Sequence, residues 1–148
     1  MKFHLTEEQQ SIQKATRDFT KGEFDDDNIL ELMENGCFPE KTFKAACNLD
    51  LIGLAYPERA GGQECSMMDN VLVIEELCRR DSTMGIALST ADMGAEIIAR
   101  LGNSEQIKNH VAPLLKGKAV SALVGPDLGD RQGPVNYRED GEIGRAHV

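Results

Sequence analysis

The 148-residue sequence lacks any apolar run that approaches the roughly 20 residues needed for a membrane-spanning helix. Its first residues, Met1 to Glu8, also lack the apolar region of an export signal. Basic residues are few, 16 against 25 acidic ones, and the formal net charge of −9 disfavours nucleic acid and anionic membranes as partners. We therefore expect a cytoplasmic protein with no nucleic-acid and no membrane partner.

Closely spaced metal ligands are missing as well. No two cysteines have the interval of a zinc knuckle or redox motif, and the histidines are scattered without partners at metal-binding intervals. We expect the cysteines to be buried or inert thiols, and we predict no metal site. The residues concerned are Cys37, Cys47, Cys65, Cys78, His4, His110 and His147.

What the sequence does contain is an ordinary folding composition, with 41% hydrophobic and 28% charged residues. A chain of this size can bury one sizeable core without disulfides or metal. The composition therefore predicts one domain, which could be incomplete.

Hydrophobic residues recur at three- and four-residue intervals in six segments, which predicts an all-α fold, a six-helix antiparallel bundle. Capping boxes are expected where Thr6 precedes Gln9 and where Ser66 precedes Asp69. The predicted helices cover about residues 6–20, 25–36, 39–49, 66–80, 84–101 and 104–116.

Three features of these helices have consequences for the site. Ser82 and Ser104 are predicted N-caps. The segment from Met84 to Leu101 is nearly all small or apolar, so we expect one long helix that is buried on most sides. Glu75 and Glu76 lie on the predicted polar face of their helix and point about 100° apart, so we expect solvated or structural carboxylates rather than an acid–base pair.

Two stretches lack a helical period. The apolar residues Leu51 to Tyr56 precede turn-forming Pro57 and two glycines, and are predicted to cross the core as a connector. Ala119 to Val124 has the length and residue types of a strand, but the chain contains no partner for it. The sequence therefore predicts the first strand of a truncated β-domain.

Four sequence elements resemble the N-terminal domain of the acyl-CoA dehydrogenases, and their order and spacing extend across residues 3–124. The elements are Leu5 to Gln9, Leu51 to Glu58 with Gly61 and Gly62, Val73 to Leu77, and Leu101 to Gln106. The resemblance implies three parts: residues 1–118 as an N-terminal helical domain, residues 119–142 as the start of a middle β-domain, and a missing C-terminal helical domain.

The resemblance also implies the chemistry of the intact enzyme. A glutamate from the C-terminal part removes the α-proton of an acyl-CoA thioester, while a hydride passes from the β-carbon to N5 of FAD. The present chain would be an N-terminal fragment without that base, inactive alone. The intact enzyme would transfer electrons to an electron-transfer flavoprotein or similar acceptor and form a homotetramer or homodimer.

The family's first middle-domain strand is usually followed by Thr-Glu-Pro-x-x-Gly-Ser-Asp, which contacts the flavin and its pyrophosphate. Here Pro126 and Gly129 match, whereas Val124, Gly125 and Asp130 stand in place of Thr, Glu and Ser. The resemblance therefore assigns cofactor contacts to Leu123, Val124, Gly129 and Asp130.

In the family, the long buried helix lines the pocket for the acyl chain. That helix here offers Ser89, Thr90, Met93 and Gly94 as substrate-binding candidates. In the alternative interpretation, Met93 only fills the core and Gly94 only permits close helix packing.

The last six residues, 143–148, continue no pattern and have a back-translation that contains a common short-read sequencing adapter. We hypothesise that they are a non-native tail, which unrelated codons in the source DNA would disprove. Two other functions stay open. One is a helical protein-interaction module with acidic faces, and the other is an acyl-CoA or nitroalkane oxidase of the same fold.

Overall fold

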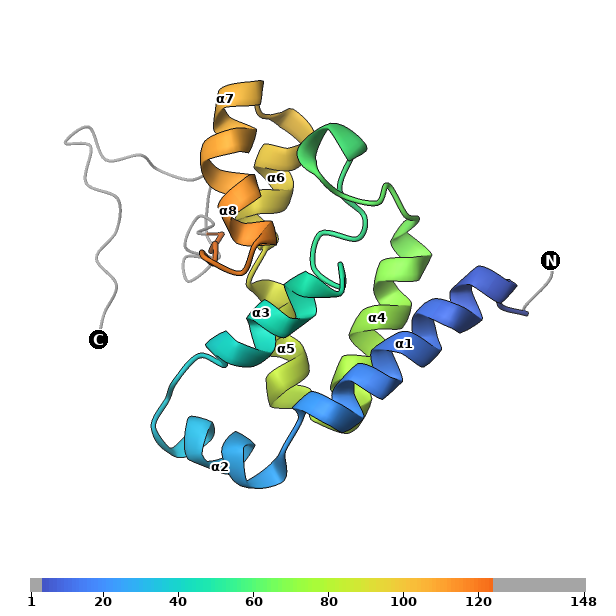
Figure 1. Cartoon of the computed structure of the whole chain (residues 1–148), viewed down its shortest axis with the longest axis vertical. Helices are drawn as coiled ribbons and strands as arrows, with labels where there is room; N and C mark the ends of the chain where they lie inside the picture. Colours follow the sequence, from blue (N-terminus) through green and yellow to red (C-terminus); the bar gives the residue numbers. More distant parts are fainter. Residues whose placement is uncertain (1–3, 124–148) are drawn as a thin grey trace, which may run out of the picture.

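The computed structural model describes residues 4–123, and this part of the chain is helical (Figure 1). The α-helices are α1 (Glu7–Glu23), α2 (Asp26–Glu34), α3 (Glu40–Asn48), α4 (Met67–Arg80), α5 (Ser82–Thr90), α6 (Met93–Leu101), α7 (Ser104–Gln106) and α8 (Ala112–Leu115). A short 3-10 helix, η1 (Glu58–Ala60), precedes α4, and a π-helical stretch, η2 (Ile107–Val111), joins α7 to α8. The six predicted helical segments are therefore present, and the fifth is divided into α5 and α6.

Local capping signals define the starts of α1 and α4 as predicted. The Thr6 side chain accepts a hydrogen bond from the Gln9 N–H, and the Gln9 side chain accepts one from the Thr6 N–H. Ser66 and Asp69 form the same reciprocal pair at α4. Each box satisfies backbone donors that a helix start leaves without an intrahelical partner.

Two predicted caps are wrong by one residue. The N-cap of α5 is Asp81, whose carboxylate accepts the Met84 N–H at 2.8 Å, and Ser82 is the first helical residue. The N-cap of α7 is Asn103 rather than Ser104. In each case the residue before the predicted serine has a side-chain oxygen that also suits an N-cap.

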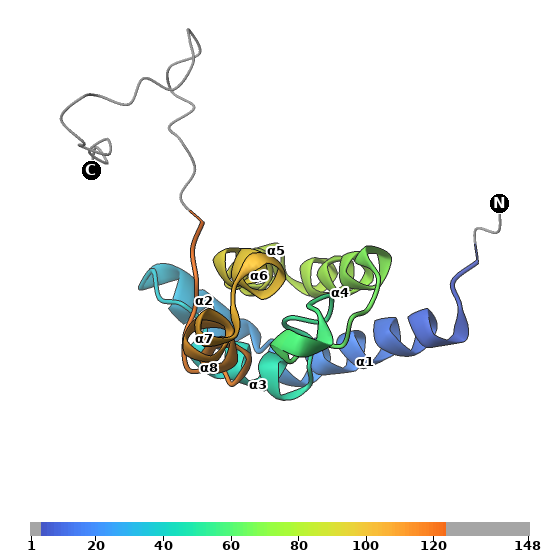
Figure 2. The same ribbon diagram turned by 90° about the horizontal axis from the view of Figure 1, so that it is seen from above.

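Figure 2 shows two layers, with α4, α5 and α6 on one side and α1, α3 and α8 on the other. Helices α4 and α5 follow each other directly and pack antiparallel (Figure 1). Helices α1 and α4 pack in parallel. Their starts are joined by a hydrogen bond from Gln9 Nε2 to Asp69 Oδ1 at 3.1 Å, and their ends by one from Arg80 Nη2 to the Phe24 carbonyl at 3.2 Å. The crossover through α2 and α3 permits this direction.

The connector between α3 and α4 crosses the core as predicted. Leu51, Ile52, Leu54 and Tyr56 are each at most 7% exposed. Gly53 has φ of 75°, which favours glycine, and a Cβ there would overlap Leu115. The connector therefore presses against the end of the last helical segment.

Pro113 lies inside the last helical segment, near its end. An α-helix would bring the proline ring against the carbonyl of Asn109. In the structure, residues 107–111 widen into a π-helical stretch, and the Ala112 N–H donates to the Ile107 carbonyl. The wider turn accommodates the proline, and the segment then ends at Gly117, which has φ of 62° as a left-handed stop.

The expected strand, Ala119 to Val124, does not form over its described residues, 119–123. An isolated strand has no ladder partner, and these residues instead lie beside α5 and α6, where the Ser121 N–H donates to the carbonyl of Ala91 between the two helices. Val124, the rest of the predicted 119–142 segment and the predicted tail at 143–148 lie outside the described residues. Within residues 4–123, no helix has the length and apolar character needed to cross a membrane.

Candidate functional site

The break between α5 and α6 lies among the four candidate substrate residues. We expected one helix from Met84 to Leu101, but α5 ends at Thr90 and α6 begins at Met93. Ala91 and Asp92 form the non-helical link, which we call the junction. Ser89 and Thr90 therefore lie on the last turn before the junction, and Met93 and Gly94 on the first turn after it.

Groups from distant parts of the chain satisfy the backbone of the junction. The Tyr56 hydroxyl lies 3.0 Å from both the carbonyl oxygen and Oδ2 of Asp92. On the other side, the Ser121 N–H donates to the Ala91 carbonyl at 2.7 Å, and Ser121 Oγ accepts the Ala95 N–H at 2.9 Å. The Asp92 carbonyl also accepts the Glu96 N–H at 2.9 Å. Because a buried unpaired backbone group is costly, the two Ser121 bonds explain how the backbone is satisfied where the helix breaks.

Burial also shifts the pKa values of the two titratable groups at the junction. Burial raises the pKa of the Asp92 carboxyl above its ordinary value, although the hydrogen bond from Tyr56 opposes the shift. Burial likewise raises the pKa of the Tyr56 hydroxyl, with the nearby Asp92 charge adding to it. The tyrosine therefore remains a protonated donor at neutral pH.

The hydroxyls of two candidate substrate residues are already hydrogen-bonded. Thr90 Oγ1 donates to the Ile86 carbonyl at 2.8 Å, and Ser89 Oγ donates to the same carbonyl at 3.3 Å. Such back-bonding to a preceding turn is common for serine and threonine near helix ends. Both hydroxyl protons are therefore already used within α5, and these two side chains contribute to the surface of the junction rather than donating hydrogen bonds to a ligand.

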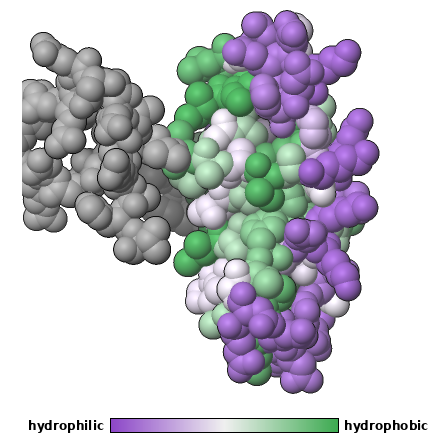
Figure 3. Space-filling model, turned by 90° about the vertical axis from the view of Figure 1, so that its left-hand side faces the viewer, coloured by the Kyte–Doolittle hydropathy of each residue, from purple (hydrophilic) through white to green (hydrophobic). Residues whose placement is uncertain are grey.

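The prediction that the long segment is buried on most sides is wrong for one face. Met93, Ile97 and Leu101 recur every four residues on α6 and are 44%, 45% and 84% exposed. Ile86 on α5 and Leu123 are also more than half exposed. Figure 3 shows hydrophobic residues gathered along one edge of the molecule and hydrophilic residues along the opposite edge.

The structure places only one of the four candidate cofactor residues. Leu123 is exposed, and it lies two residues beyond Ser121, which bonds to the junction. Val124, Gly129 and Asp130 lie outside the described residues. The substrate candidates and the start of the cofactor segment therefore lie close together.

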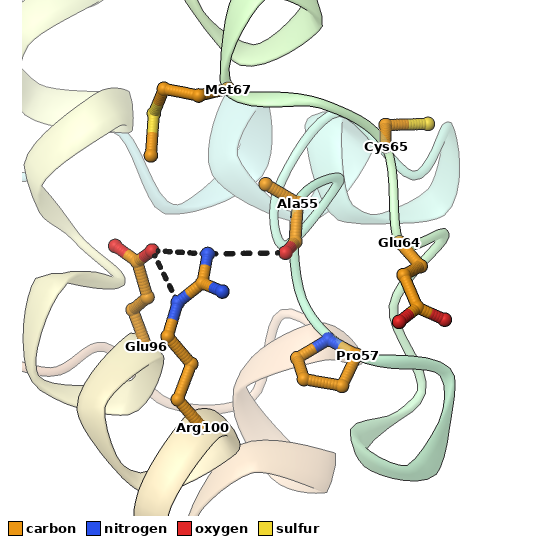
Figure 4. Close-up of a pocket in the computed structure, with 7 residues that line it drawn as sticks. All are labelled: Ala55, Pro57, Glu64, Cys65, Met67, Glu96 and Arg100. Carbon is orange, nitrogen blue, oxygen red and sulfur yellow. Dashed lines mark hydrogen bonds and ion pairs between the residues drawn. The ribbon is translucent and has the colours of Figure 1, made fainter.

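A separate surface cavity of about 330 Å³ lies between the start of α4, the connector and α6 (Figure 4). Arg100 donates to Glu96 at 2.9 and 3.0 Å and to the Ala55 carbonyl at 3.3 Å, so both charges are paired. Burial raises the pKa of Cys65, which disfavours the nucleophilic thiolate. None of the candidate substrate residues lines this cavity, which is formed by Ala55, Pro57, Glu64, Cys65, Met67, Glu96 and Arg100.

Glu76 is buried instead of lying on a polar face. Its side chain is 1% exposed and accepts two hydrogen bonds from Arg17, at 2.8 and 3.0 Å. The hydrogen bond from Arg17 holds the pKa of Glu76 below its ordinary value. Glu75 pairs separately with Arg79 at 2.8 Å, so the two carboxylates do not form an acid–base pair.

All four cysteines are free, but they do not share one environment. Cys47 is buried, and burial raises the pKa of its thiol to about 11. Cys37 is exposed, so only the inert-thiol part of the expectation can apply to it. Within the described part of the chain, no three His, Cys, Asp or Glu residues are grouped to hold a metal ion.

Comparison with known proteins gives one family. The family model described as acyl-CoA dehydrogenase, N-terminal domain, matches residues 6–118. The probable acyl-CoA dehydrogenase YngJ of Bacillus subtilis is 32% identical over 136 residues, which cover 90% of this chain and 36% of that protein. The short-chain specific acyl-CoA dehydrogenase of Clostridium acetobutylicum is 28% identical over 136 residues, which also cover 90% of this chain and 36% of that protein.

A solved structure is also similar. It is a chain from the structure of the electron transferring flavoprotein of Acidaminococcus fermentans, with a TM-score of 0.69 and 29% identity. The match covers 81% of this chain and 32% of that chain. The present chain spans about a third of the length of the curated relatives it matches.

Proposed function

Because the chain belongs to the acyl-CoA dehydrogenase family through its N-terminal domain, we propose that it forms the helical N-terminal part of an FAD-dependent acyl-CoA dehydrogenase. The intact enzyme would introduce an α,β double bond into an acyl-CoA thioester, or remove one in the reverse direction. The supporting observation is the α5–α6 junction, where the substrate candidates lie beside the start of the cofactor segment. The catalytic base and most flavin contacts would come from the rest of the enzyme.

In this proposal, the junction forms one wall of the acyl-chain pocket. Met93 is 44% exposed, so its apolar side chain is not covered, whereas the space beside Gly94 is occupied by the backbone of Ala122. An acyl chain gains about 0.8 kcal/mol for each methylene that it buries. Thr90, whose hydroxyl bonds to its own helix, would add its methyl group to this wall.

The described residues fit FAD at one position. Leu123 is 53% exposed and offers an apolar contact for the flavin ring. Contacts from the Val124 backbone to the flavin, and from the region of Gly129 and Asp130 to the pyrophosphate, complete the proposed set. When bound, FAD supplies the redox chemistry that the side chains of this chain lack.

The proposed partners follow from the same family. The substrate is an acyl-CoA, and an electron-transfer flavoprotein or similar acceptor would take the electrons. One similar protein is named as the CarC subunit of the caffeyl-CoA reductase–Etf complex of Acetobacterium woodii, which supports this type of partner. We further propose a homodimer or homotetramer for the intact enzyme and a cytoplasmic location, which four free cysteines fit.

A domain replacement tests the proposal. Residues 4–123 would replace the corresponding region of the Bacillus subtilis relative, and the purified chimera would be examined for bound FAD and for dye reduction by acyl-CoA substrates of different lengths. We expect a yellow protein with acyl-CoA-dependent activity, whereas the 148-residue chain alone should be colourless and inactive. A chimera that folds but binds no FAD would contradict the proposal.

A further inference from the structure

Ser121 connects the outgoing chain to both sides of the junction. Its N–H donates to the Ala91 carbonyl at 2.7 Å, at the end of α5. Its hydroxyl accepts the Ala95 N–H at 2.9 Å, in the first turn of α6. One residue therefore satisfies a carbonyl left free by one helix and a donor left free by the next.

Gly94 permits this contact. A Cβ at residue 94 would lie 2.8 Å from the Ala122 carbonyl oxygen and 3.3 Å from Ser121 Cβ. The first of these neighbours is backbone, which cannot move aside without displacing the segment. The absence of a side chain at Gly94 is therefore necessary for residues 121 and 122 to lie where they do.

The neighbours of Ser121 show that the contact is localised. Residues 119–123 form neither helix nor strand, and Val120 and Leu123 are 55% and 53% exposed. Ser121 is the half-buried position among exposed ones in this segment. The segment is thus attached to the helices chiefly at Ser121 and Ala122.

We propose that Ser121 and Gly94 are positioning residues that fix the point at which the chain leaves the helical domain. The two bonds and the backbone contact hold Ser121 and Ala122 against the junction. The role of this attachment rests on the proposed function, since Leu123 and Val124 are the proposed flavin contacts. The contact itself can be measured without any flavin.

Amide hydrogen exchange of the 148-residue chain tests the serine. Ser121→Ala removes the acceptor of the Ala95 N–H, so exchange at Ala95 should accelerate about fivefold, the ratio that corresponds to a hydrogen bond of about 1 kcal/mol. Ser121→Thr keeps the hydroxyl and should retain the protection. Ser82→Ala, on the exposed first residue of α5, is the matched control and should leave Ala95 unchanged.

Gly94→Ala tests the other side of the contact. The added methyl group should displace residues 121 and 122, and exchange at the Ser121 amide should accelerate by a similar factor. Alanine has a higher helix propensity than glycine, so α6 itself should not be weakened. Gly22→Ala is the matched control, because a Cβ there meets nothing within 4 Å.

The pattern of results decides the proposal. Faster exchange confined to Ala95 and Ser121, with faster tryptic cleavage after Lys118, supports it. Unchanged exchange in both Ser121→Ala and Gly94→Ala overturns it, and so does an equal loss of protection at every amide. Because these measurements contain no flavin, they can succeed even where the chimera fails to bind FAD.

Discussion

Replacing Tyr56 by phenylalanine should destabilise the chain through the junction. The ring is 2% exposed, so phenylalanine keeps the packing and removes only the hydroxyl. The one hydroxyl proton is shared between the Asp92 carbonyl and Oδ2, both at 3.0 Å, and the carbonyl also accepts the Glu96 N–H at 2.9 Å, so Oδ2 is the acceptor that loses most. A hydrogen bond to a charged group contributes about 1.5–3 kcal/mol, and since Asp92 is only half-buried, we expect a loss of about 1–2 kcal/mol in the free energy of unfolding.

The same substitution should change the titration of Asp92. Burial already raises the pKa of this carboxyl, and the Tyr56 hydrogen bond lowers it, so Tyr56→Phe should raise the pKa further. A carboxyl with a raised pKa in the folded state binds more protons folded than unfolded, so stability falls as the pH rises from its unfolded pKa through its folded pKa. This decrease should be larger in Tyr56→Phe than in the parent chain.

Urea unfolding at several pH values and carbon-detected titration of Asp92 would measure both effects. Tyr56→Phe in an Asp92→Ala background is the control, because only the backbone carbonyl of residue 92 then remains as an acceptor and the cost should be smaller. An equal cost in both backgrounds would refute a role for the Asp92 side chain. An unchanged Asp92 pKa in Tyr56→Phe would refute the electrostatic part of the argument.

Three further predictions concern packing and charge. Gly85→Ala should destabilise the chain by about 1–3 kcal/mol in thermal unfolding, because the new Cβ would lie 2.7 Å from the Cys78 backbone nitrogen, and normal stability would show that α4 and α5 can separate. Leu88→Ala should lower the free energy of unfolding in urea by about 2–5 kcal/mol, because Leu88 is 0% exposed. Leu101→Ala is the control, since Leu101 is 84% exposed and its loss should change stability by less than about 0.5 kcal/mol. Similar costs for the two variants would contradict the assigned core. Glu76→Gln should make stability depend less on pH at acid pH. The lowered pKa of Glu76 contributes stability above its unfolded pKa, and this stability is lost as the pH falls through its folded pKa. An unchanged pH dependence at acid pH would argue against the Arg17–Glu76 ion pair.

The features predicted well from sequence depend on neighbouring residues. The Thr6–Gln9 and Ser66–Asp69 boxes involve residues three positions apart, and a helix start needs only such local partners. The six helical segments follow from apolar spacing within each segment, which reports one buried face. Both kinds of signal are complete within one or two turns of helix.

The features that were missed depend on contacts between distant residues. Glu76 shares a face with Val73 and Leu77 on α4, so its position in the apolar stripe was a signal of burial. What permits the burial is Arg17, 59 residues earlier, which no local pattern indicates. The strand expected at residues 119–124 does not form over residues 119–123 for a related reason, since a strand requires a partner that the described residues do not provide.

The helix break shows how such distant contacts determine the site. Residues 84–101 have the small and apolar composition of one continuous helix, and nothing in their own sequence requires an interruption at Ala91. Ser121 satisfies the Ala91 carbonyl and the Ala95 N–H that the interruption leaves free, and Tyr56 adds a hydrogen bond to Asp92 from the core. Since Tyr56 belongs to the buried connector and Ser121 to the exposed outgoing chain, Tyr56→Phe should lower global stability whereas Ser121→Ala should mainly open the local contact. In this interpretation Tyr56 stabilises the junction from the core, and Ser121 attaches the outgoing chain to it at the surface. Urea unfolding of both variants measures the first role, and hydrogen exchange of both variants measures the second.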